Sequence, residues 1–165
     1  MGTRSGSVDP GILIFLMRQY GFDADRIEDI LNKKSGLLGI SGLSGDMRDI
    51  LAGMHAGNER AQLAFDLYVH SLRTAIGGMA AVLGGLDVLV FTAGIGENSP
   101  EVRAATCKGL EFLGIKMDAK RNQGALLDCE ISSSRSRARV LIIRAAEDWA
   151  IAQECWKLCR CSVLS

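Results

Sequence analysis

The segment with the clearest capacity for chemistry places two glycines between an apolar run and a helix start. Val88 to Phe91 form a short apolar run, which is typical of a buried strand. Residues 92–98 follow, and their two glycines allow the backbone to turn sharply and to come close to a ligand. Ser99 and Pro100 are suited to the N-cap and the first position of a helix. Strand, glycine turn and helix together leave backbone N–H groups and a positive helix end where an anionic phosphate can be held.

Taken alone, this pattern has low specificity, because most short Gly-x-Gly turns between a strand and a helix serve packing. The segment matches neither Gly-x-x-x-x-Gly-Lys-Ser/Thr nor Gly-x-Gly-x-x-Gly. A dinucleotide-binding domain is a distant alternative, since it needs an acid about twenty residues beyond the glycines. Asp118 lies near that distance, but the third glycine of the motif is absent.

The five cysteines favour free thiols over a disulfide framework or a zinc site. Their number is odd, and no secretion signal accompanies them. Cys155, Cys159 and Cys161 gather near the end of the sequence, but no histidine lies near enough to complete a zinc set. Residues 132–134 are three serines without a histidine or acid partner, so a nucleophile is not expected there.

Composition indicates one globular domain. The chain has 165 residues, of which 48% are hydrophobic, enough for a real core. Nineteen basic and nineteen acidic residues cancel, so no basic excess points to nucleic acid. The apolar run from Gly11 to Met17 is too short to span a bilayer and lacks the layout of a secretory signal. A cytoplasmic protein without membrane or nucleic-acid partners is therefore expected.

The elements that must position the glycine segment are mostly helices. Helices are expected from Pro10 to Gly21, after Asp23, from Ser44, from Asn58 to Leu83, from Pro100 and from Ala145 to Cys159. The longest should present an apolar face of Leu63, Leu67, Leu72, Ile76 and Met79. Lys33 to Gly45 holds four glycines and three serines and is expected to be a long functional loop.

Strands are few. Val88 to Phe91 and Arg139 to Ile143 should form a parallel pair joined by a right-handed crossover. Ile115 to Met117 is a candidate for another short strand, and Ile131 to Arg137 is low in complexity and expected to be mobile. Because two parallel strands make a poor sheet alone, the fold needs more strands than this sequence supplies.

Three separate segments resemble the acetate kinase family. They are MGTRSGSVDP at 1–10, KKSGLLGISGLSGDMRDI at 33–50 and VFTAGIGENSPEVR at 90–103. Three motifs in the family's order and spacing are far more specific than any one of them. The resemblance implies an α/β fold, a partial actin-like or RNase H-like ATPase domain of the superfamily of acetate and sugar kinases, Hsp70 and actin. It implies a C-terminal nucleotide-binding part over 1–153 and a divergent tail over 154–165.

The resemblance also implies an activity in organic acid metabolism. Acetate kinases are phosphotransferases with a carboxyl group as acceptor. They transfer the γ-phosphoryl group of ATP reversibly to acetate, or to another short carboxylate, giving acetyl phosphate and ADP with Mg²⁺. The family's N-terminal domain, with most of its catalytic residues, has no counterpart in this sequence, so the chain alone is expected to be inactive. The alternative is a non-catalytic nucleotide-binding or dimerisation fragment, with a homodimer formed through an exposed sheet edge.

Individual residues acquire roles through the same resemblance. Arg4 matches an active-site arginine, whose planar fork can bind phosphoryl or carboxylate oxygens. Asp46, Met47 and Arg48 match the segment along adenine and ribose, where Arg48 can stack on the base. The alternative for these three is the first turn of a helix, with Met47 in the core.

The glycine segment and one acid complete the implied site. The residues that match the turn against the nucleotide are Ala93, Gly94, Ile95, Gly96, Glu97 and Asn98. Glu97 or Asn98 could bond ribose or phosphate, although Glu97 would repel a nearby phosphate. Glu147 matches the carboxylate that helps to hold Mg²⁺. The family reads Pro-Thr-Asn-Glu-Glu where residues 144–148 read Arg-Ala-Ala-Glu-Asp, so Glu147 as a simple helix-start acid is the alternative.

Overall fold

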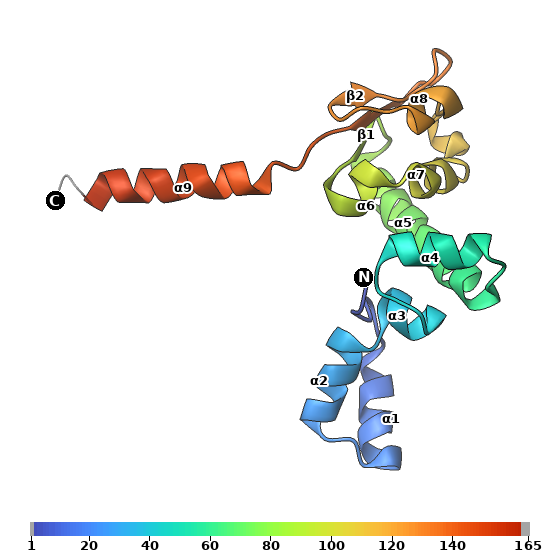
Figure 1. Cartoon of the computed structure of the whole chain (residues 1–165), viewed down its shortest axis with the longest axis vertical. Coiled ribbons are helices and arrows are strands. Elements are labelled where there is room, and N and C mark those ends of the chain that lie inside the picture. The colour runs from blue at the N-terminus through green and yellow to red at the C-terminus, as the bar shows by residue number, and fades with distance from the viewer. Residues whose placement is uncertain (1, 163–165) are drawn as a thin grey trace. The chain divides into compact units, whose positions relative to one another are not determined.

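The computed structural model describes residues 2–162, and the last three residues of the expected tail lie outside this range. The chain divides into two compact units, Met1–Ile76 and Gly77–Ser165, each of which is described by itself. The helices and strands, shown in Figure 1, are α1 (Pro10–Tyr20), α2 (Ala24–Lys33), α3 (Gly36–Ser41), α4 (Met47–His55), α5 (Glu59–Leu83), β1 (Val88–Phe91), α6 (Ala93–Asn98), α7 (Pro100–Cys107), η1 (Glu111–Leu113), α8 (Ala119–Gln123), β2 (Cys129–Glu130), β3 (Arg139–Ile142) and α9 (Glu147–Ser162).

The first helices of the first unit begin and end where local chemistry predicts. The Asp9 side chain accepts a hydrogen bond from the Gly11 N–H, and Pro10 opens α1. Gly21 ends that helix with φ 64°, a left-handed conformation that glycine adopts without steric cost. Asp23 caps α2 through the Arg26 N–H. The structure confirms these caps. The sequence could predict them because a cap depends only on neighbouring residues.

The segment from Lys33 to Gly45 is not the predicted loop, because it contains α3. Its small residues permit close packing: a Cβ added at Gly39 would lie 2.6 Å from the Lys34 carbonyl oxygen. The buried Ser41 hydroxyl donates to the Leu37 carbonyl at 2.6 Å. The start of α4 is also corrected, since its N-cap is Asp46 and not Ser44.

The limits of α5 are close to those predicted. Its expected apolar face is wrong in part, because Leu72 and Ile76 are half-buried while Met79 is 62% exposed. The buried stripe in the first unit consists of Ala61, Ala64, Phe65 and Val69. Leu63 and Leu67, which were expected to be buried, are 51% and 41% exposed. Both sets have helical spacing, so the sequence pattern alone does not show which one meets the core.

The second unit is built on a three-stranded sheet in the order β1-β3-β2. The parallel pairing of β1 with β3 is confirmed, with Val88 opposite Arg139 and Phe91 opposite Ile142. The antiparallel β2 has only two residues and was not predicted. The expected strand near residue 115 is reduced to two isolated bridges, at Ile115 and Met117.

The segment Ile131 to Arg137 was predicted to be mobile, but its first residues are buried in the second unit. Ile131 is fully buried and Ser132 is 3% exposed. The Ser136 hydroxyl donates to the Ala138 carbonyl at 2.6 Å and accepts from the Lys116 N–H at 2.8 Å. Among the described residues, no helix combines the length and apolar character that a membrane crossing requires.

Candidate nucleotide and phosphate site

The predicted glycine turn is a short helix, α6, directly after β1. Ala93 opens it with φ 59°, which is uncommon for a residue with a Cβ. A Cβ added at Gly96 would lie 3.3 Å from the Phe91 carbonyl carbon, so this glycine lets α6 approach β1. A Cβ at Gly94 would have no neighbouring heavy atom within 4 Å. Gly96 therefore serves packing, whereas Gly94 borders open space.

The polar side chains of α6 bond to the protein backbone. Glu97 Oε1 accepts from the Ala93 N–H and from the Ala145 N–H, each at 2.8 Å. The Asn98 side-chain amide donates to the Gly94 carbonyl at 2.8 Å. Glu97 thus joins two segments 48 residues apart, and one N–H that was expected to face a phosphate is already occupied. Direct contact of Glu97 or Asn98 with a nucleotide stays a prediction.

The helix expected to face the glycines, α7, has a capped and buried start. The Ser99 hydroxyl accepts from the Val102 N–H at 3.3 Å, and Ser99 is 6% exposed. Ser99 and Pro100 therefore take their predicted places as N-cap and first residue. The start of α7 serves the packing of the second unit.

Arg103 is the structural residue that the sequence analysis missed. Its side chain is 1% exposed and donates to the Gly96 and Glu97 carbonyls at 2.9 and 2.8 Å. It also donates to the Asn122 side-chain oxygen at 2.8 Å and to the Asn122 carbonyl at 3.1 Å. Burial lowers the pKa of Arg103, since desolvation disfavours the charged form. In the sequence, the one signal for this role was the position of Arg103, the fourth residue of the helix that follows the glycine motif.

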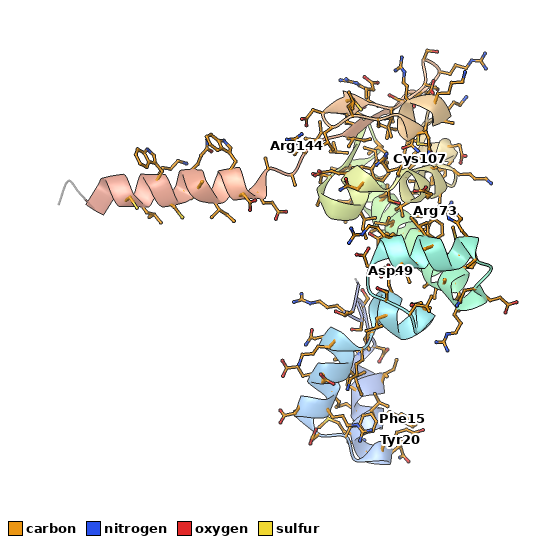
Figure 2. All side chains as sticks on the ribbon, viewed as in Figure 1. Phe15, Tyr20, Asp49, Arg73, Cys107 and Arg144 are labelled. Atoms are coloured by element: carbon orange, nitrogen blue, oxygen red, sulfur yellow. The ribbon has the colours of Figure 1, made fainter. Side chains whose placement is uncertain are left out.

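A cavity of about 430 Å³ lies where the α6 turn meets the connection from β3 to α9. It is lined by Ala93, Gly94 and Glu97 and by residues 144–148. Three of these residues carry carboxylates and only Arg144, labelled in Figure 2, carries a guanidinium. A bare phosphate entering this cavity would therefore meet a net negative lining.

Residues 144–148, the second segment that lines the cavity, differ from the family's Pro-Thr-Asn-Glu-Glu. Ala145 and Ala146 offer no side-chain oxygen, and Ala146 has φ 44°. Glu147 and Asp148 lie in the first turn of α9 and are exposed. No group of three or more His, Cys, Asp or Glu among the described residues is placed to hold a metal ion. The donors suit Mg²⁺ only in its usual nucleotide-bound form, with one or two carboxylates and the remaining ligands from phosphate and water.

In the first unit, Asp46 and Arg48 form an exposed ion pair at the start of α4. Asp46 accepts from the Arg48 backbone N–H at 2.9 Å and from the Arg48 Nε at 3.0 Å. The hydrogen bond from the Arg48 guanidinium is the main cause that lowers the pKa of Asp46 from 3.8 to about 2. The Arg48 side chain is 89% exposed, so it can leave this pair for a ligand at little cost.

Met47 and Arg4 have contrasting surroundings. Met47 is 4% exposed, which is the core position that the sequence left open as its alternative role. Arg4 is exposed, and its guanidinium has no hydrogen bond or ion pair to another described residue. The segment that carries it is held by neighbours: the Ser5 N–H donates to the Leu31 carbonyl at 2.8 Å, and the Ser35 N–H donates to the Thr3 carbonyl at 2.9 Å.

A contact between two glycines aligns the two predicted segments of the first unit. A Cβ added at Gly2 would lie 2.6 Å from the Gly45 carbonyl oxygen. The Arg4 segment and the Asp46–Arg48 segment therefore lie side by side. In the second unit, the cavity described above brings Ala93, Gly94 and Glu97 together with Glu147, whereas the predicted site residues Ile95, Gly96 and Asn98 do not line it. Each group is thus assembled within its own unit.

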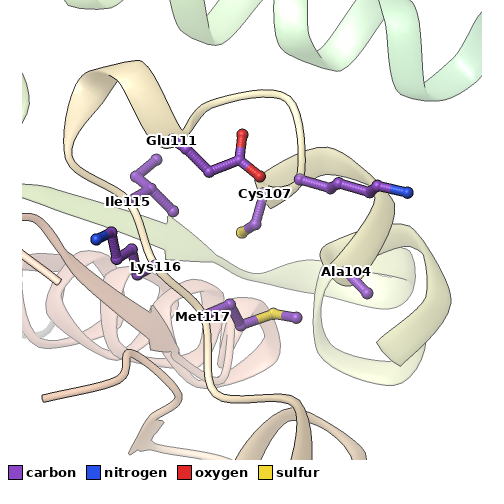
Figure 3. A pocket seen from close by; sticks show the side chains of 7 residues that line it. Ala104, Cys107, Glu111, Ile115, Lys116 and Met117 are labelled. Atoms are coloured by element: carbon purple, nitrogen blue, oxygen red, sulfur yellow. The ribbon is translucent and has the colours of Figure 1, made fainter. Parts of the chain in front are cut away.

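A second cavity, of about 370 Å³, lies elsewhere in the second unit (Figure 3). Cys107, Ile115 and Met117 are among its lining residues, together with Lys108 and Lys116. Burial raises the pKa of the Cys107 thiol to about 12, so this cysteine is a poor nucleophile. Cys107, Cys129, Cys155 and Cys159 are free thiols, as predicted, while the Cys161 side chain lies outside the described residues.

The fold and the site define the class of protein: the chain is part of an actin-like ATPase domain, with few strands and several helices. It matches 93% of its length to the crystal structure of Porphyromonas gingivalis acetate kinase, with a TM-score of 0.88 and 45% identity, and covers 39% of that structure. It matches Entamoeba histolytica acetate kinase with a TM-score of 0.87 at 40% identity, and covers 41% of that structure. A Francisella tularensis propionate kinase is matched over 87% of this chain with a TM-score of 0.81 at 35% identity, and 36% of it is covered.

The sequence comparisons name the family. The acetokinase family model matches residues 1–153, and the chain belongs to this family. It is 56% identical over 158 residues to the acetate kinase of Trichormus variabilis and 57% identical over 158 residues to that of Microcystis aeruginosa. These matches cover 96% of this chain and 39% of each relative, so the chain spans about two fifths of their length.

Proposed function

We propose that this chain supplies the nucleotide-binding part of an acetate kinase, which transfers the γ-phosphoryl group of ATP to acetate or another short carboxylate. The products are acetyl phosphate and ADP, and the reaction is reversible. The observation that carries the proposal is the cavity of about 430 Å³ between the α6 turn and the start of α9. It joins the α6 turn, which belongs to a motif that matches the family, to the segment of Glu147, where the two acids of the family's pattern are kept in kind.

In this proposal the phosphates lie against Gly94, whose backbone borders open space. Arg144 is the one basic side chain of the cavity and can bind phosphate oxygens through its fork. For adenine and ribose we propose Asp46 and Arg48 of the first unit, on their match to the family alone, with Arg48 leaving its exposed ion pair to stack on the base. Met47 supports this surface from the core.

Arg4 is the proposed catalytic residue of this chain. Its exposed guanidinium stands on a segment fixed by backbone hydrogen bonds, so it can be presented to a phosphoryl or carboxylate group without rearrangement of the fold. Phosphoryl transfer needs neutralisation of charge on the transferring group and alignment of donor and acceptor. One guanidinium does not meet both needs, and we therefore expect the chain alone to form no acetyl phosphate.

Mg²⁺ is proposed to enter this cavity together with the nucleotide. Glu147, with Asp148 beside it, would hold the ion, which when bound neutralises phosphate charge. The three carboxylates of the lining support this dependence, because they oppose entry of an uncompensated polyphosphate.

Calorimetry with ATP, with and without Mg²⁺, tests the proposal. We expect binding that is stronger with Mg²⁺ and that is weakened by Gly94→Val, because valine would project into the cavity. Arg48→Ala should weaken binding by roughly tenfold if the base stacks on the guanidinium. The matched control is Arg26→Ala, whose guanidinium lies 3.8 Å from the Phe22 ring centre. Absence of binding at millimolar ATP would contradict the proposal.

A non-catalytic role is the second candidate. The chain spans only about two fifths of its relatives, and nucleotide binding or self-association without turnover is the function to expect if no acetyl phosphate is formed even when the chain is assembled with the rest of an acetate kinase. The two candidates separate cleanly in a coupled assay, because only the first predicts turnover when the chain is assembled with the rest of an acetate kinase.

A further inference from the structure

The cavity of about 370 Å³ in the second unit has two walls of different kinds (Figure 3). One wall is the face of α7 with Ala104, Cys107 and the C-cap residue Lys108, followed by Glu111 in η1. The other wall is the extended segment 115–117. Small-molecule sites occupy roughly 300–1,000 Å³, and this cavity lies within that range. Its size therefore suits a ligand of several carbon atoms.

The segment 115–117 makes its backbone bonds on the side away from α7. The Lys116 N–H donates to the Ser136 hydroxyl, and the Lys116 carbonyl accepts from the Ser133 N–H, each at 2.8 Å. Both neighbours of Lys116 form the two isolated bridges described above. Because these backbone groups already have partners, this wall cannot close the cavity by pairing with α7. The cavity is thus formed before any ligand enters it.

The interior of the cavity is apolar. Ile115 is fully buried, Cys107 is 4% exposed and Met117 is half-buried. In Figure 3 the side chains of Cys107 and Met117 lie around the same space as Ala104. Because burial raises the pKa of the Cys107 thiol to about 12, the thiol stays neutral and behaves as a small apolar group. Such a lining accepts an alkyl chain without leaving a polar group of the ligand unpaired.

The rim of the cavity is charged. Lys108, Lys116 and Glu111 are exposed, so two ammonium groups stand against one carboxylate. Neither ammonium group forms an ion pair with another residue in the described part of the chain. Their flexible stems can therefore turn toward an anion without breaking a pair. The excess of one positive charge matches a head group with one negative charge, and Glu111 opposes a second.

We propose that this cavity binds a medium-chain carboxylate, with its alkyl chain against Cys107 and Met117 and its head group held by Lys108 and Lys116. A phosphate monoester fits less well, because it carries roughly 1.5–2 negative charges at pH 7 and Glu111 would repel the second. The cavity shares no lining residue with the cavity of about 430 Å³ at the α6 turn. The proposal therefore does not rest on the proposed function.

Octanoate titrated onto the full chain tests the proposal, with methyl NMR of Met117 as the reporter. We expect a saturable shift with a dissociation constant on the order of 0.1–1 mM, the affinity that a ligand of this size can reach. Hexanoate should bind roughly tenfold more weakly, because two fewer methylene groups are buried. Octylamine should leave the Met117 signal unchanged, because its head group is positive.

Paired variants of the rim test the head group. Lys108→Gln combined with Lys116→Gln should weaken octanoate binding roughly tenfold. Lys120→Gln combined with Lys157→Gln removes the same charge from exposed positions outside the cavity and should leave the affinity unchanged. Glu111→Gln should act in the opposite direction, tightening octanoate binding roughly twofold and improving the binding of octyl phosphate. All five positions are exposed, so these variants should keep the fold, which the amide spectrum verifies.

Three results would overturn the proposal. The Met117 methyl signal could show no saturable shift at roughly ten times the expected dissociation constant. The two lysine pairs could weaken octanoate binding equally, or hexanoate could bind as tightly as octanoate. Tighter binding of octyl phosphate than of octanoate by the unchanged chain would show that the head group is not a carboxylate.

Discussion

Two arginines show how differently the two units use the same charged group. Arg48 in the first unit has a side chain that is 89% exposed and pairs with the Asp46 carboxylate. Arg103 in the second unit is 1% exposed and bonds to four neutral oxygens. The carboxylate raises the pKa of Arg48, whereas desolvation lowers that of Arg103. An exposed pair is cheap to open and suits a ligand contact, while a buried guanidinium fixes a framework.

The largest predicted effect comes from removing the buried guanidinium. Arg103→Ala leaves the Gly96 and Glu97 carbonyls and the Asn122 side chain without their donor, so we expect a loss of about 3–5 kcal/mol in the free energy of unfolding. Chemical denaturation followed by circular dichroism measures it. Arg121→Ala is the control, because that arginine is exposed and makes one bond of 3.3 Å, to the Ser132 carbonyl. Equal losses in the two variants would contradict a framework role for Arg103.

How far the sequence predicts this framework depends on the range of the interactions. Asp9, Asp23 and Ser99 cap helices as expected, because a cap depends on residues within the same turn. The parallel pairing of β1 and β3 also follows from two apolar runs separated by a helical crossover. Local chemistry is sufficient in these cases.

Long-range packing decides the rest. Two sets of residues on α5 have helical spacing, and only tertiary contacts select the buried one. The β2 strand is two residues long and exists because β3 offers it an edge. Arg103 was part of a recognised motif, yet its burial arises from Asn122, nineteen residues away. At the candidate site, the sequence did not predict the backbone bonds that occupy the side chains of Glu97 and Asn98.

An intermediate effect is expected from the carboxylate bridge. Glu97→Ala removes the acceptor shared by the Ala93 and Ala145 N–H groups, which should cost about 1–2 kcal/mol because Glu97 is half-buried. The Ala145 amide should lose protection in hydrogen exchange followed by NMR. Glu97→Gln keeps an oxygen acceptor and should retain most of that protection.

Matched controls sharpen the assignment to Glu97. Glu101→Ala removes the same charge four residues along the chain, where the carboxylate accepts only from the Ser99 hydroxyl at 3.4 Å. It should leave the Ala145 amide protected. A protected Ala145 in Glu97→Ala would show that another contact holds the connection from β3 to α9. Glu97→Gln should also favour ATP binding without Mg²⁺, since the cavity then has one negative charge fewer.

The smallest effect concerns the exposed pair of the first unit and is best seen as a titration. The pKa of Asp46 lies below its ordinary 3.8, at about 2, because Arg48 and a backbone N–H stabilise the carboxylate. A lowered pKa in the folded chain means that the carboxylate's stabilisation is complete above about pH 4 and is lost as the pH falls through about 2. Carboxyl-carbon NMR of Asp46 should give a midpoint near 2, and Arg48→Ala should raise it toward 3.8. Arg60→Ala, whose guanidinium bonds to the Ile40 carbonyl instead, should leave it unchanged. A titration midpoint near 3.8 for Asp46 in the wild type would contradict this ion pair and show that the Arg48 guanidinium is not bonded to Asp46 in solution.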